Sequence, residues 1–130
     1  MSTPVNRRKV KPNDDNEMPA IGLGTYLSPP SEVTNAVAAG WKCGMRHFDC
    51  AQFYKNESEV GEALQMLSSE PIYCREDLLI TRNVWNSHHR PENVVKALNQ
   101  TLKDLQTDYV DLYLVCCLTF LFPNIADTAI

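Results

Sequence analysis

Three stretches of the chain place apolar residues at intervals of three and four, the spacing that gathers them on one face of an α-helix. The first helix is expected after Ser31, a favoured N-cap residue, and is expected to end near Gly44. The second is expected after Asn56, with Glu59 at the capping-box position, and the third from Pro91. The three apolar faces are Val33, Ala36, Val37, Gly40 and Trp41; Val60, Ala63, Leu64 and Leu67; and Val94, Leu98, Leu102 and Leu105.

Short apolar runs lie between these helices. The run at residues 78–81 is apolar without alternation, which is typical of a strand that is covered on both faces. Four strands are predicted, over residues 20–26, 46–50, 78–81 and 109–115. Before them, residues 10–19 contain a turn-forming cluster of Asn and Asp and predict a small β-hairpin, although Pro12 removes one ladder donor.

The resulting order alternates strand and helix, which predicts an α/β fold with a parallel sheet and helices packed outside it. Right-handed crossovers bring the carboxyl ends of parallel strands to one edge, where parallel α/β folds carry their sites. Asp49, Asn83 and Cys116 fall at or just beyond predicted strand ends, and Tyr54 lies in the loop after the second strand. We therefore expect these four side chains to lie at the same edge of the sheet.

Composition and charge narrow the functional classes. The chain has 130 residues, of which 44% are hydrophobic and 22% charged, with a net charge of −4, so one globular domain is expected and nucleic acid is not an expected partner. The longest apolar run, residues 112–122, is too short to cross a membrane. Five cysteines at irregular spacing and no secretory leader favour free thiols in the cytoplasm. Residues 1–9 have no pattern and are expected to form a flexible tail.

Asp49 and Tyr54 are the candidate chemical pair, since a carboxylate at a strand end can orient or charge-balance a phenol that donates a proton. From the residues alone, a polar strand end without activity is the favoured interpretation. Gly22 and Gly24 are too sparse for a phosphate loop and favour a tight turn. His88 and His89 have no further ligands at zinc spacing, so no metal site is expected.

Several motifs resemble one known family in the same order and at the same spacing. They occupy residues 18–26, 44–54, 56–64, 75–78, 85–86 and 105–114. These stretches are similar to the aldo-keto reductases, and within them to the aldehyde and aldose reductase group. The family fold is a (β/α)8 barrel, so the resemblance implies a partial TIM barrel with about four parallel strands, formed by residues 10–115 and preceded by the hairpin. Residues 116–130 do not resemble the family's continuation and are expected to be a divergent tail.

The resemblance implies NADPH-dependent reduction of aldehydes and ketones. Tyr54 matches the family's proton donor and Asp49 its aspartate, while Trp85 matches an aromatic residue that lines the pocket for a small carbonyl substrate. The turn expected to contact the cofactor, together with Asp49, consists of Gly22, Leu23, Gly24, Thr25 and Tyr26.

Two positions depart from the family pattern. Asn83 stands where the family has a lysine, and Cys116 stands where it has a histidine. Arg82 is adjacent to Asn83, but neighbouring strand residues point to opposite faces, so Arg82 is not expected to replace the lysine. A cation beside a phenol lowers its pKa, and a neutral amide does not.

The sequence therefore leaves two functional readings open. One is a carbonyl reductase that uses Tyr54, and the other is a truncated, non-catalytic form that acts through its interactions. We expect no measurable NADPH binding by this chain alone, and we expect self-association through the open edges of an incomplete barrel.

Overall fold

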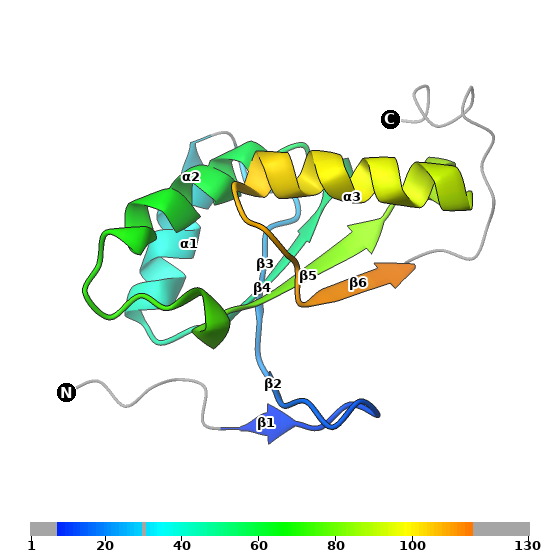
Figure 1. Ribbon diagram of the computed structural model, residues 1–130. Helices are drawn as coiled ribbons and strands as arrows, with labels where there is room; N and C mark the ends of the chain where they lie inside the picture. The colour runs from blue at the N-terminus through cyan, green and yellow to red at the C-terminus, as the bar shows by residue number, and fades with distance from the viewer. Residues whose placement is uncertain (1–7, 30, 116–130) are drawn as a thin grey trace.

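The computed structural model describes residues 8–29 and 31–115. Figure 1 shows three helices: α1 (Glu32–Lys42), α2 (Glu57–Ser68) and α3 (Pro91–Leu105). The strands are β1 (Lys9–Val10), β2 (Met18–Pro19), β3 (Leu23–Gly24), β4 (His47–Ala51), β5 (Leu79–Val84) and β6 (Leu112–Val115). Short 3₁₀ turns span Gln52–Tyr54, Arg75–Asp77 and Asn86–His88.

The last four strands form one sheet in the order β3-β4-β5-β6, and every neighbouring pair is parallel. In the described residues the sheet is open, and it is the first part of a barrel rather than a closed one. The hairpin predicted before it is present, since β1 pairs antiparallel with β2. The predicted α/β class with four parallel strands and a preceding hairpin is thus confirmed.

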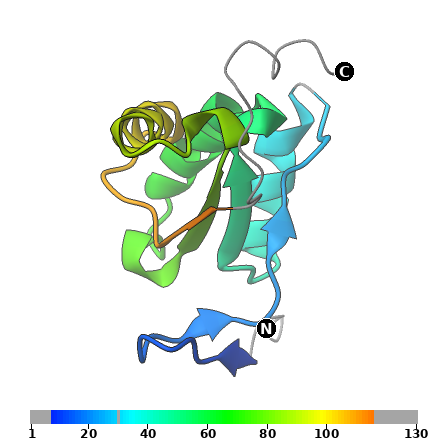
Figure 2. The ribbon, with the colours of Figure 1, turned by 90° about the vertical axis from the view of Figure 1, so that its right-hand side faces the viewer.

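All three helices pack on one face of this sheet (Figure 2). Phe48 and Cys50 of β4 and Ile80 of β5 belong to the same buried cluster as the helix residues. Because side chains alternate along a strand, Asp49 and Asn83 lie on the opposite face, which is the inner face of the barrel. The remaining members of the cluster are Val33, Val37, Trp41, Val60, Ala63, Leu64, Leu67, Leu78 and Leu105.

The helix ends differ in part from the sequence prediction. Pro91 begins α3, and Gly44, at a φ of 90°, follows the end of α1, both as predicted. Ser31 and Asn56 occupy the N-cap positions, but neither side chain makes a capping hydrogen bond. The predicted capping box is wrong: the Glu59 carboxylate instead accepts a hydrogen bond from the backbone N–H of Ser31, 28 residues earlier.

The strand boundaries also shift. β3 is confined to Leu23–Gly24, within the longer predicted strand, and β5 continues beyond Thr81 to Val84. β6 starts only at Leu112. The segment before it instead contacts Arg75, whose guanidinium donates to the Tyr109 carbonyl and the Asp111 carboxylate.

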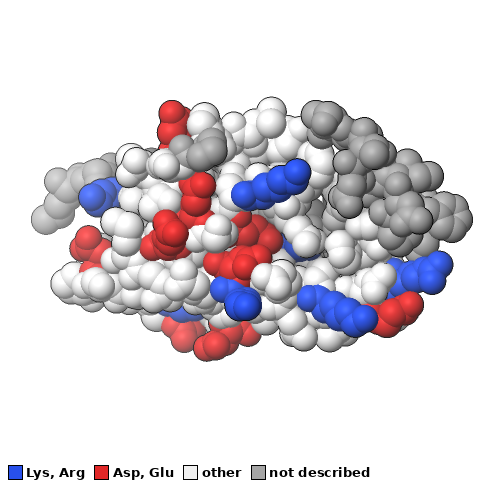
Figure 3. Space-filling view, turned by 90° about the horizontal axis from the view of Figure 1, so that it is seen from above, with Lys and Arg blue, Asp and Glu red and all other residues white. Residues whose placement is uncertain are grey.

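Figure 3 shows the charged side chains on the upper face of the molecule, as it is oriented in Figure 1. Acidic side chains gather near the centre of that face, and the described basic side chains stand at separate points without a continuous basic patch. Among the described residues, no helix has the length and apolar character that a membrane crossing requires.

Candidate active site

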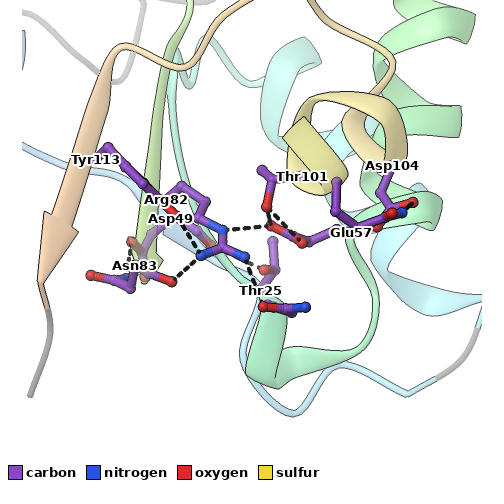
Figure 4. Close-up of polar contacts among 10 residues, drawn as sticks. Thr25, Asp49, Glu57, Arg82, Asn83, Thr101, Asp104 and Tyr113 are labelled. Atoms are coloured by element: carbon purple, nitrogen blue, oxygen red, sulfur yellow. Dashed lines mark hydrogen bonds and ion pairs between the residues drawn. The ribbon is translucent and has the colours of Figure 1, made fainter. Parts of the chain in front are cut away.

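Asp49, Tyr54 and Asn83 converge at the carboxyl edge of the sheet. The Tyr54 hydroxyl donates to Asp49 Oδ2 over 3.4 Å, and the Asn83 side-chain amide donates to Asp49 Oδ1 over 3.2 Å. Both oxygens of one carboxylate are therefore engaged, one by a phenol and one by an amide. Figure 4 shows the Asn83 and Asp49 side chains close together at the ends of β5 and β4.

The chain returns Tyr54 to Asp49 through a tight turn directly after β4. Ala51 is extended, Gln52–Tyr54 forms one 3₁₀ turn, and Lys55 closes it in the left-handed region at a φ of 55°. The Lys55 N–H donates to the Gln52 carbonyl. This reversal places a residue only five positions after Asp49 within hydrogen-bond distance of its carboxylate.

The turn after β3 lies against the same strand end. Thr25 is 1% exposed, and both its backbone N–H and its hydroxyl donate to the carbonyl of Asp49, over 3.2 and 3.0 Å. A Cβ built on Gly24 would meet no heavy atom within 4 Å, so this part of the turn is open. A Cβ on Gly22 would come within 2.8 Å of the His47 ring, so Gly22 is needed for close approach.

Four aromatic side chains contact one another in a row and form what we call the aromatic cluster: Tyr54, Tyr26, Phe53 and Trp85. The rings of Tyr26 and Tyr54 are 5.0 Å apart, and Phe53 stacks on Trp85 at 4.2 Å with 12° between planes. Tyr26 is 53% exposed. The sequence pointed to Tyr26, Tyr54 and Trp85 but missed Phe53, whose position beside Tyr54 in the turn was the available signal.

No cation from β5 enters this site. Arg82 is fully buried on the helix side of the sheet, where its Nε donates to Glu57 over 3.3 Å and its guanidinium also donates to the carbonyl of Asn83. Thr101 of α3 donates to the same Glu57 carboxylate (Figure 4). Within residues 8–29 and 31–115, Asp49 forms no ion pair. The expectation that Arg82 does not take the lysine's place is borne out by this geometry.

Burial is the largest cause of the pKa shifts of Cys50 and Glu57, which lie on the helix side of the sheet behind the site. It raises the pKa of the Cys50 thiol to about 12, and the nearby Glu57 and Asp49 carboxylates add to the increase. Burial also raises the pKa of Glu57, although Arg82 opposes that shift. Cys50 is therefore a neutral packing residue and has no thiolate for chemistry.

Cys116, the fourth residue expected at this edge, lies outside the described residues. A cavity of about 740 Å³ lies at the opposite edge of the sheet, between the hairpin and the amino ends of the strands. Its walls include Lys9, Glu17, Arg46, Leu79 and Leu112, and they do not include Asp49 or Tyr54.

Known proteins resemble this chain closely over the same elements. Curated relatives include aldo-keto reductase family 1 member A1 of Mus musculus, 48% identical over 100 residues that cover 76% of this chain and 31% of that protein. Aldo-keto reductase family 4 member C11 of Arabidopsis thaliana is 47% identical over 103 residues, which cover 79% and 33%. The chain thus spans about a third of the length of the curated relatives it matches.

Solved structures agree with the fold. The aldose reductase of Schistosoma japonicum superposes with a TM-score of 0.85 at 45% identity, covering 88% of this chain and 38% of that one. An aldo-keto reductase of Bombyx mori, solved in complex with NADP, gives a TM-score of 0.86 at 34% identity and covers 92% and 41%. The model of the aldo/keto reductase family matches residues 20–129. With most of its length matched, this chain belongs to the aldo/keto reductase family.

Proposed function

We propose that the edge formed by Asp49, Tyr54 and the turn after β3 is the proton-donating side of a carbonyl-reducing site that works with NADPH. The observation that carries this proposal is the 3.4 Å hydrogen bond from the Tyr54 hydroxyl to Asp49 at the carboxyl end of β4. In a parallel α/β sheet this edge is where substrates meet catalytic groups.

The residues of the chain have distinct parts in this proposal. Tyr54 gives its proton to the carbonyl oxygen, and Asp49 orients the Tyr54 hydroxyl. The stretch of Gly22, Leu23, Gly24, Thr25 and Tyr26, which is open at Gly24, would hold the nicotinamide end of the cofactor together with Asp49, and the stacked Phe53 and Trp85 would line the substrate side. NADPH, when bound, supplies a hydride to the carbonyl carbon. The free thiols of Cys43, Cys50 and Cys74 suit action in the reducing cytoplasm.

A second function is favoured by Asn83. An unperturbed phenol has a pKa near ~10 and needs a neighbouring positive charge to become a better acid. Asn83 donates a neutral amide hydrogen bond to Asp49 and brings no charge, so it stabilises the resting arrangement without activating Tyr54. On this reading the chain is a non-catalytic member of the family that retains part of an ancestral site.

A chimaera distinguishes the two proposed functions. In it, residues 20–115 of this chain replace the corresponding part of the mouse relative, which supplies the rest of the barrel. NADPH oxidation with 4-nitrobenzaldehyde is the assay. Asn83→Lys should raise the rate by roughly 10²-fold, the lower range of assistance to proton transfer. Asn83→Met, which has similar length but no charge, should not raise it.

Tyr54→Phe in the Asn83→Lys background should then abolish the gain. If Asn83→Lys folds and gains nothing over Asn83→Met, the proton-donating role of Tyr54 is rejected and the non-catalytic function stands. The unmodified chimaera measures how much activity the native Asn83 allows.

A further inference from the structure

Asn56 stands at the N-cap of α2, but its side chain does not cap the helix. Its Nδ2 instead donates to the carbonyl of Thr25 over 2.8 Å, and the residue is only 4% exposed. Its Oδ1 is buried and has no hydrogen-bond partner among the described residues. A buried amide that gives up its capping bond and leaves an acceptor unpaired is costly, so its contact with Thr25 calls for an explanation.

Thr25 continues this contact to the site. Its N–H and hydroxyl both bind the carbonyl of Asp49, so the start of α2, the turn after β3 and the end of β4 are joined through buried hydrogen bonds. The residue that follows Thr25 is Tyr26, whose ring lies 5.0 Å from that of Tyr54. The position of Tyr26 therefore depends on where Thr25 is held.

The far end of the same loop is held by the same helical turn. The N–H of Ser31 donates to Glu59 Oε2 over 2.8 Å, and the Thr34 hydroxyl donates to the Glu59 carbonyl over 3.0 Å. The first turn of α2 thus fixes both ends of the loop that carries Tyr26. Glu59 holds the end next to α1, and Asn56 holds the end next to the site.

We propose that Asn56 is a positioning residue that acts through Thr25 to hold the Tyr26 ring against Tyr54, so that one side of the site has a fixed aromatic wall. The inference rests on the proposed function only in taking Tyr54 as a site residue. The arrangement of the two rings can be measured without cofactor, substrate or turnover. Failure of this inference is therefore distinguishable from failure of the proposed reaction.

The test is fluorine NMR of the whole chain labelled with 3-fluorotyrosine. The five signals are assigned by single Tyr→Phe substitutions at positions 26, 54, 73, 109 and 113. Asn56→Ala and Asn56→Asp should both move the Tyr26 and Tyr54 signals and leave those of Tyr73 and Tyr109 in place. Asn99→Asp is the control, since it makes the same change at an exposed position of α3, and it should leave the signals of Tyr26, Tyr54, Tyr73 and Tyr109 in place.

Acidification gives a readout that a merely structural role would not move. At neutral pH the carboxylate introduced by Asn56→Asp cannot donate to the Thr25 carbonyl, but once protonated it regains an O–H donor. The Tyr26 and Tyr54 signals of Asn56→Asp should therefore return toward the wild-type positions as the pH falls, while those of Asn56→Ala should not. Circular dichroism confirms that each variant remains folded over this range.

Unchanged Tyr26 and Tyr54 signals in the folded variants, or equal movement of all five signals, would overturn the proposal. If neither variant folds, hydrogen exchange of the wild-type chain tests the proposal. The side-chain amide protons of Asn56 should exchange with solvent at least about tenfold more slowly than those of the exposed Asn99, as expected for a persistent buried hydrogen bond. Equal exchange rates would overturn the proposal equally.

Discussion

Arg82 and Glu57 form a buried ion pair between β5 and the first turn of α2, with exposed side-chain fractions of 0% and 5%. Removing one partner of such a pair leaves the other charge buried without compensation. We expect Arg82→Met to lower the free energy of unfolding in urea by about 3–5 kcal/mol. The double change Arg82→Met with Glu57→Leu should recover most of that loss, because two apolar residues of similar size replace the pair. A cost below about 1 kcal/mol for the single change would show that Glu57 finds another partner.

The pKa of Glu57 gives the same cluster a pH dependence. Burial raises this pKa above its ordinary value of 4.5, so the folded chain holds a proton on Glu57 more tightly than the unfolded chain does. The stability that protonated Glu57 contributes is fully present below the unfolded pKa and is lost as the pH rises through the folded pKa. Glu57→Gln removes this titration.

Unfolding in urea at several pH values measures the effect. As the pH falls from neutral toward 4.5, wild type should gain stability relative to Glu57→Gln. A difference that stays constant, or that changes in favour of Glu57→Gln, would contradict the raised pKa.

At the level of single residues, the sequence identified Asp49, Tyr54 and Asn83 because strand ends in a parallel sheet share an edge. It also placed Arg82 on the other face, since strand alternation is a local rule. It placed Thr25 in the turn expected to contact the cofactor, but it did not identify Asn56 or Phe53 as neighbours of the site. Asn56 reads as a cap from its local sequence, and only the contact with Thr25, 31 positions away, shows its other role.

Among the helices, α2 and α3 approach each other closely at Gly61. A Cβ built there would collide with the backbone carbonyl of Asp104 and lie 3.0 Å or less from Leu105 backbone atoms. Gly61→Ala should therefore destabilise the fold by about 1–3 kcal/mol through overpacking, although alanine favours a helix more than glycine does.

Gly40→Ala in α1 is the matched control. Its nearest neighbour would be the end of the flexible Leu23 side chain at 3.2 Å, which can move aside. This change should cost little or stabilise the helix by up to about 1 kcal/mol. If thermal or urea unfolding ranks the two variants the other way, the close approach of α2 and α3 at Gly61 is not rigid.

Periodicity predicted all three helices because each buries one stripe of residues, as Val33, Val37 and Trp41 do in α1. In α3 the buried stripe is Ala97, Thr101 and Leu105, so only Leu105 of the predicted apolar face is fully buried. Periodicity could not predict how the helices end. Glu59 has a capping residue three positions before it, yet its carboxylate accepts from Ser31, because α2 packs beside α1 and the N-cap N–H of α1 lies 2.8 Å from Glu59 Oε2. Such contacts between elements decide the use of polar side chains at helix ends.

The whole described molecule has helices on one face of its sheet only. The strand register places Leu79, Leu112 and Leu114 on the other face with Asp49, and the end of β6 exposes Leu114 and Val115 at 40% and 56%. We propose that copies of this chain associate through this face, because a barrel normally fills it with layers of facing side chains. Sedimentation should show concentration-dependent association with binding of the dye ANS, and Leu114→Lys should reduce both. A monodisperse monomer that binds no dye would contradict the proposal.

Binding of NADPH depends on how much of the barrel is present. The described site offers a cofactor one open turn and one carboxylate, and that carboxylate is already engaged by Tyr54 and Asn83. The chain spans about a third of the length of the curated relatives it matches.

We therefore expect titration of the isolated chain into NADPH to leave the cofactor fluorescence unchanged. Asn83→Lys should leave it equally unchanged, because one added charge near the nicotinamide end cannot hold the rest of the molecule. The chimaera with the mouse relative is the positive control and should bind. A micromolar dissociation constant for the isolated chain would contradict the expectation and would mean that the edge around Asp49 and Tyr54 holds the cofactor by itself.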